Sequence, residues 1–222
     1  MSIAFFDMDG TIIGGDTNDI SIGEFVNRGI ARESILTSLN NFERQFYEGT
    51  LNVSEFLKFA VKPLIGMDRD SLYKVLHDIV KTSIMPLVYP GAKRAIRFHN
   101  DRNDTVVIVT STMDYLAEHI AEQLNIKYVI ASPMEKKDGV LTGEICGIPA
   151  FQKDKVTRIN MFLKEHDLTL EDSYGYGDTV NDVPMLMMCT HRYAVNPNKV
   201  LLESDSIKEL TVVDWKKIGI RV

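Results

Sequence analysis

Nine residues near the start of the chain, IAFFDMDGT at positions 3–11, constrain its fold more than any other stretch. They begin with four consecutive apolar residues, a run typical of a short strand that is buried on both faces of a parallel sheet. Asp7 and Asp9 follow, and Gly10 lets the chain turn sharply away. Because open α/β sheets bind ligands beyond the carboxyl ends of their strands, we expect both aspartates to lie at such an edge.

Two carboxylates this close repel each other unless a cation or a shared proton lies between them. The pair therefore favours a metal-dependent site. A calcium loop of the EF-hand type is excluded, because its sixth and twelfth positions would be Ile12 and Asn18 instead of glycine and glutamate. On these residues alone, Asp9 as a simple helix cap remains an alternative.

The chain has 222 residues, enough for one large domain or for a domain with an insertion. Its formal net charge of −6 gives no general attraction to nucleic acid or to a membrane surface, and we expect neither as a partner. Cys146 and Cys189 make no disulfide framework and no zinc pattern. No basic segment precedes the first apolar run, and no stretch reaches the ~20 apolar residues of a membrane span, so we expect a soluble cytoplasmic protein.

A helical pattern replaces the strand pattern after the first strand. Apolar residues recur three and four positions apart over 35–46, 53–60 and 72–79. Gly49 and the segment 63–70 separate these helices. We predict a helical bundle without strands over residues 15–85, and we interpret its aromatic residues as core and not as contacts to a cofactor.

Alternating α/β character returns near residue 89. Patterns of buried strands occur at 106–109, 128–130, 173–176, 192–195 and 211–213, and helical patterns at 91–101, at 113–124 and around Lys155. Asp138 and Gly139 are the expected turn of a hairpin. This order predicts a doubly wound parallel sheet that is interrupted by a helical cap. We expect an α/β core over residues 1–14 and 86–222, and the cap over 15–85.

Three further groups of polar residues accompany the predicted strands. Thr110 ends a strand, where its hydroxyl and the following backbone N–H groups can hold a phosphate. Lys155, early on its helix, offers a compact cation, and Asp178 and Asp182 form a second acidic pair around a turn that contains Gly177. Each group alone is weak evidence for a functional site, since such residues are usually turn residues or solvated charges.

Taken in order, these groups resemble the motifs of phosphatases in the haloacid-dehalogenase superfamily. The likeness is to the phosphoserine-phosphatase-like branch, which has a Rossmann-like core and a helical cap after the first motif. The matching segments are DMDGT (7–11), VIVTST (107–112), the lysine of FQKDKVTRI (151–159) and GYGDTVND (175–182), with further likeness in GDTND, YEGTLN and YPGA. The resemblance covers nearly the whole chain.

The resemblance implies hydrolysis of a small phosphorylated metabolite through an aspartyl-phosphate on Asp7. Asp9 is expected to protonate the leaving group and then to activate water. Mg²⁺ is expected to be held by Asp7, by the backbone carbonyl of Asp9, by Asp178 and, through water, by Asp182.

The same resemblance assigns the phosphate contacts. Thr110 and Lys155 are expected to bind and neutralise the phosphoryl oxygens, with Ser111 beside them. Asn181 is expected to orient the phosphate or the water shell of the metal.

The same residues bear on other reactions of this superfamily. A dehalogenase needs no second acid and no metal, so Asp9 and the pair Asp178 and Asp182 disfavour that reaction. A phosphomutase would use the same residues and stays open. A binding protein that has lost catalysis is a distant alternative, because every expected catalytic side chain is present.

The cap residues bear on the substrate. Asp16 stands where the resembling phosphatases have a glutamate that binds the amino group of phosphoserine, and Ala60 stands where we expect their carboxylate-binding arginine. Arg44, Lys58 and Lys62 are nearby cations, but none is at the matching position, and a lysine does not readily replace a bidentate arginine. We therefore expect an amino-alcohol phosphate such as histidinol phosphate, with phosphoserine phosphatase as the alternative.

Overall fold

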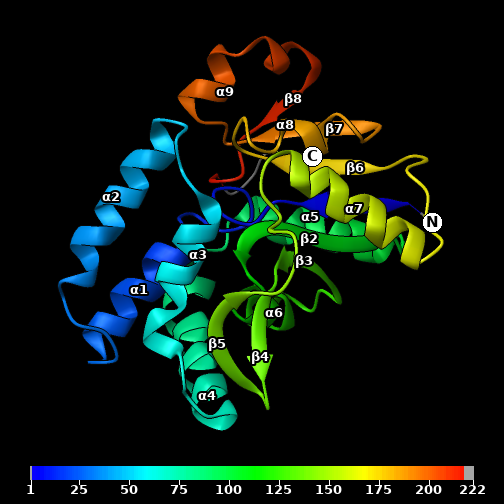
Figure 1. Cartoon of the computed structure of the whole chain (residues 1–222). Coiled ribbons are helices and arrows are strands. Elements are labelled where there is room, and N and C mark those ends of the chain that lie inside the picture. The colour runs from blue at the N-terminus through cyan, green and yellow to red at the C-terminus, as the bar shows by residue number, and fades with distance from the viewer. Residues whose placement is uncertain (1, 218–222) are drawn as a thin grey trace.

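The computed structural model describes residues 2–217 of the chain. Its main sheet has six strands in the order β3-β2-β1-β6-β7-β8, and every neighbouring pair is parallel (Figure 1). The strands are β1 (Ile3–Phe6), β2 (Thr105–Met113), β3 (Tyr128–Ser132), β6 (Tyr174–Gly177), β7 (His191–Val195) and β8 (Thr211–Val213). The predicted parallel α/β sheet is confirmed.

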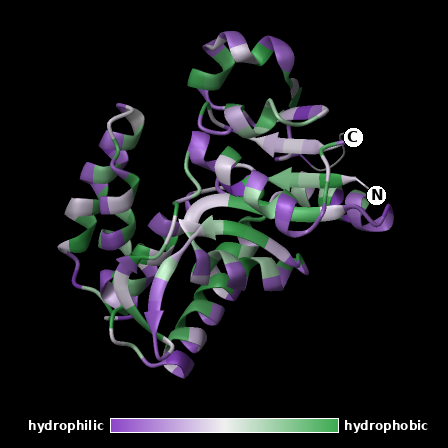
Figure 2. Ribbon diagram, turned by 45° about the vertical axis from the view of Figure 1, so that its right-hand side comes forward, coloured by the Kyte–Doolittle hydropathy of each residue, from purple (hydrophilic) through white to green (hydrophobic). Residues whose placement is uncertain are grey.

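The continuous apolar run of β1 is explained by its central place in this sheet. Ala4 and Phe6 pack on one face, with α5 (Pro90–Asp101) and α6 (Asp114–Leu124). Ile3 and Phe5 pack on the other face, with α7 (Lys153–Glu165) and α8 (Val183–Leu186). Figure 2 shows the hydrophobic colouring concentrated on the inner strands and on the helix faces turned toward them. A strand covered on both sides needs no polar alternation.

Strand β2 is longer than the apolar run at 106–109 suggested. It continues to Met113, and its pairing with β3 shifts register between Val109 and Met113. Such an irregularity bends a strand and re-aims the side chains in it. The polar residues 110–112 therefore lie on a bent strand end and not in a free loop.

Helices occupy the segment between β1 and α5. They are α1 (Thr17–Asn27), α2 (Ile35–Tyr47), α3 (Val53–Val61) and α4 (Arg69–Ile79), with shorter turns at η1 (Lys62–Leu64), η2 (Val80–Ile84) and η3 (Met85–Leu87). The side chains of Asp16, Asn52 and Asp68 accept N–H groups at the starts of α1, α3 and α4. Within the described residues, no strand interrupts positions 15–85, as predicted.

The chain leaves the sheet and returns to it at adjacent positions. Gly14 N–H donates to the Leu87 carbonyl at 2.9 Å, and Tyr89 N–H donates to the Ile12 carbonyl at 2.9 Å. From this junction we propose a cap at 15–85 and a core at 1–14 and 86–222, of which residues 1 and 218–222 lie outside the described residues. The exact boundaries stay a prediction.

The predicted hairpin is present as β4 (Met134–Lys137) and β5 (Val140–Ile145). Asp138 and Gly139 have φ values of 54° and 80°, the left-handed backbone of a two-residue hairpin turn. The hairpin packs on the cap: Lys58 of α3 forms an ion pair with Glu144 of β5. Figure 1 shows β4 and β5 beside α3 and α4, away from the main sheet.

The remaining elements are α9 (Lys199–Glu203) and η4 (Asp205–Glu209), which precede β8. No helix in the described part of the chain is long and apolar enough to cross a lipid bilayer.

Candidate active site

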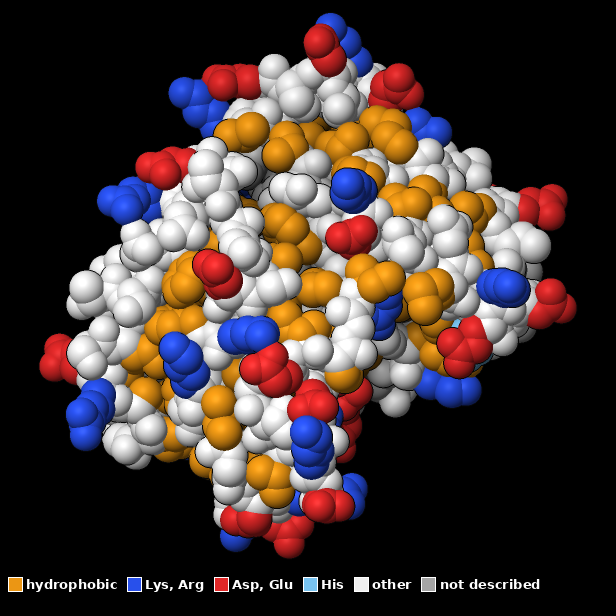
Figure 3. Space-filling view, in the orientation of Figure 1, with side chains coloured by type: hydrophobic (Ala, Val, Ile, Leu, Met, Phe, Trp, Pro, Cys, Tyr) orange, Lys and Arg blue, Asp and Glu red, His pale blue; other side chains and the backbone are white. Residues whose placement is uncertain are grey.

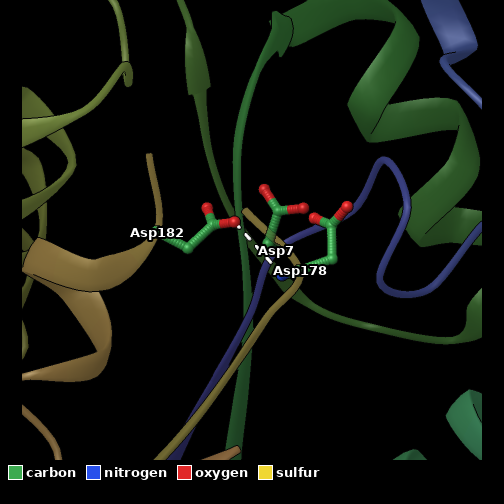
Figure 4. A group of neighbouring side chains, drawn as sticks. All are labelled: Asp7, Asp178 and Asp182. Atoms are coloured by element: carbon green, nitrogen blue, oxygen red, sulfur yellow. Dashed lines mark hydrogen bonds between the residues drawn. The ribbon is translucent and has the colours of Figure 1, made fainter. Parts of the chain in front are cut away.

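Three carboxylates meet at the carboxyl edge of the sheet. Asp7 follows β1, Asp178 follows the adjacent strand β6, and Asp182 directly precedes α8. One oxygen of each lies within 4.8 Å of the others (Figure 4). Because β1 and β6 are parallel neighbours, residues more than 170 positions apart share one edge, as the sequence predicted.

Two glycines permit this close approach. Gly10 has a φ of +82°, and a Cβ there would lie 2.1 Å from Asp178 Oδ2. A Cβ on Gly177 would lie 2.5 Å from the Cβ of Asp182. Any larger residue at either position would push a carboxylate out of place.

Lys155 from α7 joins the group. Its Nζ donates to Asp7 Oδ1 and to Asp182 Oδ1, at 2.6 Å each, and all three side chains are buried. Burial alone would lower the pKa of Lys155, but Asp182 and Asp7 raise it above its usual range, so the ammonium stays charged. The site therefore holds one fixed cation among several carboxylates.

The carboxylates outnumber the ammonium group of Lys155, and the pKa values of two of them are raised. Burial, with the charge of Asp182, raises the pKa of Asp7 to about 8 in spite of Lys155. Burial also raises the pKa of Asp178 well above its usual range, with Asp182 and Asp7 adding to the effect. A further cation at this position would favour the ionised forms of both groups.

Asp182 has both oxygens engaged. Oδ1 accepts from Lys155, and Oδ2 accepts from the N–H of Asp178 at 3.2 Å, the contact dashed in Figure 4. The N–H and the hydroxyl of Thr179 also donate to Oδ2, at 3.1 Å each. Asp182 thus holds Lys155 and the loop after β6 in one arrangement.

Asp9 has a different environment from Asp7. Its Oδ1 accepts the N–H of Thr17 at 2.7 Å, and its Oδ2 accepts the hydroxyl of Thr112 at 2.8 Å. Burial raises the pKa of Asp9, and the bonds from Thr17 and Thr112 offset part of the increase. Thr17 is the first residue of α1, so Asp9 accepts a hydrogen bond from the start of a helix. The N-cap residue of that helix is nevertheless Asp16.

The hydroxyl of Thr110 points toward Asp9. It donates to Asp9 Oδ2 at 3.4 Å and accepts the N–H of Thr112 at 3.1 Å, and the side chain is buried. Its neighbour Ser111 lines the cavity above the carboxylates instead.

That cavity has a volume of about 240 Å³. Every site residue predicted from the sequence lines it except Thr110: Asp7, Asp9, Asp16, Ser111, Lys155, Asp178, Asn181 and Asp182. A larger cavity of about 780 Å³ lies along β7 and β8, and no predicted site residue lines it.

Sequence reasoning missed other residues of the cavity wall, namely Gly15, Phe46, Phe151, Thr179 and Asn198. Phe46 belongs to the aromatic pattern that we interpreted as core. It lies in the last turn of α2 and is 38 % exposed, whereas Leu39, in the same apolar repeat over 35–46, is buried. The sequence signal that could have identified Phe46 is its position as the last residue of this apolar pattern, at the end of the helix.

No cation from the cap is among the described residues that line the cavity. Ala60 is fully buried in the core, and Lys58 is paired with Glu144. Neither Arg44 nor Lys62 lines the cavity, so Lys155 is the one cationic side chain among its described lining residues. Asp16 lines the cavity while its Oδ1 accepts from the N–H groups of Asn18 and Asp19.

Comparison with known proteins agrees with this geometry. A histidinol-phosphatase of Neisseria meningitidis serogroup C (strain 8013) is 27% identical over 220 residues, which cover 97% of this chain and 99% of that protein. A phosphoserine phosphatase of Methanocaldococcus jannaschii is 26% identical over 206 residues, which cover 92% and 90%. The solved structure of a protein of unknown function from Bordetella pertussis Tohama I matches with a TM-score of 0.86 and 29% identity, covering 96% of this chain and 98% of that one.

The family model of haloacid dehalogenase-like hydrolases matches residues 4–187, from β1 through the acidic turn to α8. This span contains Asp7, Asp9, Lys155 and the pair Asp178 and Asp182. The resemblance noted in the sequence is thereby confirmed, and the chain belongs to the haloacid dehalogenase-like hydrolases, among the phosphatases of that family.

Proposed function

We propose that this phosphatase is a Mg²⁺-dependent phosphomonoester hydrolase that works through an aspartyl-phosphate on Asp7. The observation that carries the proposal is the group of three carboxylates in one cavity: Asp7 and Asp182 are buried and bonded to Lys155, and Asp178 lies beside them. Among the described residues, the hydrogen-bond donor to the Asp7 carboxylate is Lys155, which binds Oδ1. The other oxygen of Asp7 is therefore placed to attack phosphorus.

The donor set fits a hard divalent ion, because it consists of carboxylate oxygens. Asp7, Asp178 and the backbone carbonyl of Asp9 would hold Mg²⁺, with Asp182 acting through water because both of its oxygens already accept hydrogen bonds. When bound, the ion would neutralise phosphoryl oxygens and the mutual repulsion of the carboxylates.

The contacts of Asp9 support a role in proton transfer. As the bond from Asp7 to phosphorus forms and the ester bond breaks, Asp9 gives its proton to the leaving oxygen. It then takes a proton from the water that attacks the aspartyl-phosphate. A carboxyl whose pKa is raised by burial is suited to hold that proton, and Thr17 and Thr112 fix its direction.

The remaining polar residues would bind the phosphoryl group. The ammonium of Lys155 offsets the charge that develops on its oxygens, and Ser111 and Asn181 line the cavity where those oxygens would lie. Thr110 lies at the bent end of β2, and its hydroxyl contacts Asp9. We therefore assign Thr110 to the same phosphate site.

The substrate we propose is a small phosphorylated metabolite with a cationic or neutral tail, such as histidinol phosphate, hydrolysed in the cytoplasm. Asp16 offers an anion to an amino group, and one relative is named for histidinol phosphate. Phosphoserine is the second candidate because another relative is named for it. Its carboxylate would meet no cap cation in the cavity, and an unpaired desolvated charge is penalised by ~2–5 kcal/mol.

The test is release of inorganic phosphate from histidinol phosphate, phosphoserine and an aryl phosphate, with Mg²⁺ and with excess chelator. We expect Mg²⁺-dependent turnover and a higher kcat/KM for histidinol phosphate than for phosphoserine. Full turnover in chelator would contradict the metal assignment, and no release of phosphate from any ester would contradict hydrolysis. If phosphoserine is the better substrate, Arg44 or a neighbouring lysine supplies its cation.

The two aspartates can be separated with an activated aryl phosphate. Asp7→Asn should form no covalent phospho-enzyme, whereas Asp9→Asn should still become phosphorylated, because a good leaving group needs no proton. Equal trapping of aspartyl-phosphate in both variants would refute this division of roles.

A further inference from the structure

A second cavity adjoins the one that contains the carboxylates. It has a volume of about 250 Å³ and lies between the end of α2 and the loops that precede α7, α8 and α9. The two cavities share the lining residues Phe46, Phe151, Thr179, Asn181 and Asn198. A molecule whose phosphate lies at Asp7 can therefore extend directly into this second space.

The walls of the second cavity are largely apolar and contain no cation among the described residues. Leu51 comes from the cap, and Val180 and Val200 come from the core, where they are 38 % and 59 % exposed. Among the described lining residues, Glu48 is the single ionisable one, and its carboxylate lies 3.9 Å from Arg44. Figure 3 shows hydrophobic side chains gathered below α9 on the face toward the viewer.

Gln152 forms part of the wall between the two cavities. Its Nε2 donates to Asn181 Oδ1 at 3.1 Å, which leaves the amide N–H groups of Asn181 free to be donated elsewhere. Gln152 also has φ 49° and ψ −125°, a backbone conformation that side-chain-bearing residues rarely adopt. Strain of this kind persists where the surroundings hold a residue in place, and it is concentrated at functional sites.

We propose that the second cavity binds the leaving group of the phosphomonoester, that this group is neutral or cationic and partly apolar, and that Gln152 positions Asn181 between leaving group and phosphate. The proposal rests on the proposed function, because it takes the phosphate to lie at Asp7. The chemistry follows from the walls: Leu51 and the two valines favour apolar surface, and Glu48 disfavours a carboxylate.

The first test narrows the second cavity without touching the carboxylates. Val180→Trp should lower kcat/KM for histidinol phosphate by about tenfold or more, mainly through KM, because the bulky residue excludes the extended tail. Turnover of ethanolamine phosphate, whose short tail need not enter the cavity, should change by less than about threefold. Val200→Trp, from α9, is a second variant with the same expected result.

Val212→Trp is the matched control, since Val212 lies on β8, is 52 % exposed and lines neither cavity. Equal loss for both substrates in the folded Val180→Trp and Val200→Trp variants, or no loss for either, would overturn the leaving-group site. If wild-type protein hydrolyses no phosphomonoester, the proposed function fails and this inference fails with it. Turnover of both esters with no selective effect overturns this inference alone.

The second test concerns Gln152 and uses a double-mutant cycle. Gln152→Ala should lower kcat/KM in wild-type protein and have little further effect in Asn181→Ala, because its action passes through Asn181. Gln152→Gly removes the same amide and relieves the backbone, so it should lose as much activity without losing thermal stability. Independent losses from the two alanine substitutions, or full activity in Gln152→Gly, would overturn the positioning role.

Discussion

The two ends of the same sheet hold buried polar clusters of opposite character. At the carboxyl end, Lys155 is the one cation, within the part of the chain that the structure describes, that is paired with the group of Asp7, Asp178 and Asp182. At the amino end, the buried Asp104 and His99 are paired with each other and with their neighbours. The first cluster has one paired cation for three carboxylates, whereas the carboxylate of Asp104 in the second is bonded to both His99 and Arg102.

The amino-end cluster is balanced in detail. Asp104, whose side chain is 2 % exposed, accepts from His99 Nδ1 at 2.9 Å, from Arg102 Nε at 3.0 Å and from the N–H of Ser2 at 3.1 Å. Because Nδ1–H donates to this carboxylate, Nε2 of a neutral His99 accepts the hydroxyl of Tyr176 at 3.0 Å. Burial opposes ionisation of Asp104, but the bonds from His99 and Arg102 outweigh it and lower its pKa.

The difference separates stability from function. The balanced cluster ties the starts of β1, β2 and β6 together and needs no ligand. The unbalanced cluster raises carboxyl pKa values and would be relieved by an added cation, as expected of the ligand site that we propose. Substitutions at the two ends should therefore have opposite consequences.

The largest effect is expected at the carboxyl end. Asp7→Asn should lower kcat/KM by about 10³-fold or more, because the proposed nucleophile is lost. Without metal its melting temperature should stay level or rise, since Lys155 keeps Asp182 as a partner and one repelling charge is gone. Steady-state kinetics and thermal melts check both. Activity within tenfold of wild type would contradict the assigned nucleophile.

Mg²⁺ should restore balance at the same end. At about 100 times its dissociation constant, the ion should stabilise the protein by about 2.7 kcal/mol, seen as a higher melting temperature. Asp178→Asn should shrink this shift. Asp172→Asn, at the exposed rim of the amino-end cluster, is the control and should leave the shift unchanged. An undiminished shift in Asp178→Asn would place the ion elsewhere.

At the amino end the order of effects reverses. Asp104→Asn should reduce the free energy of unfolding by about 1.5–3 kcal/mol, because bonds from three donors lose a charged acceptor. Its kcat/KM at a temperature where it is folded should equal that of wild type. Asp101→Asn, at the exposed end of α5, is the matched control and should change neither quantity. If the Asp104→Asn protein had the same free energy of unfolding as wild type, the cluster would contribute nothing to stability.

The smallest effect is a pH dependence whose sign differs between the ends. Burial lowers the pKa of His99 below 6.5 despite Asp104, so its contribution is present above about pH 6.5 and is lost as the pH falls toward the folded value. The pKa of Asp7 is raised from 3.8 to about 8, so its contribution is lost as the pH rises between those values. Each term is limited to about 1.4 kcal/mol per pH unit.

Denaturant titrations of metal-free protein between pH 5.5 and 7.5 measure this difference. His99→Gln should make the slope of unfolding free energy against pH less positive than in wild type, and Asp7→Asn should make it more positive. Slopes that move in the same direction for both variants would contradict the contrast between the two ends.

Local patterns in the sequence determined the elements and most residues of the candidate site. The apolar run before Asp7, the run at 106–109 and the Asp138–Gly139 turn each depend on neighbouring residues, and each forms the predicted strand or hairpin. The candidate carboxylates could be found because parallel strands end at one edge, whatever their separation in the chain. That rule needs only the order of the elements.

Only the tertiary structure decided which side chains face which. The hydroxyl of Thr110 is directed to Asp9 by the bent end of β2, and the last turn of α2 brings Phe46 to the cavity instead of the cap core. The strained backbone of Gln152 and the pairing of His99 with Asp104 also depend on several elements at once. Periodicity reports which face of an element is buried, whereas register, strand irregularities and packing between distant segments set the contacts of each side chain.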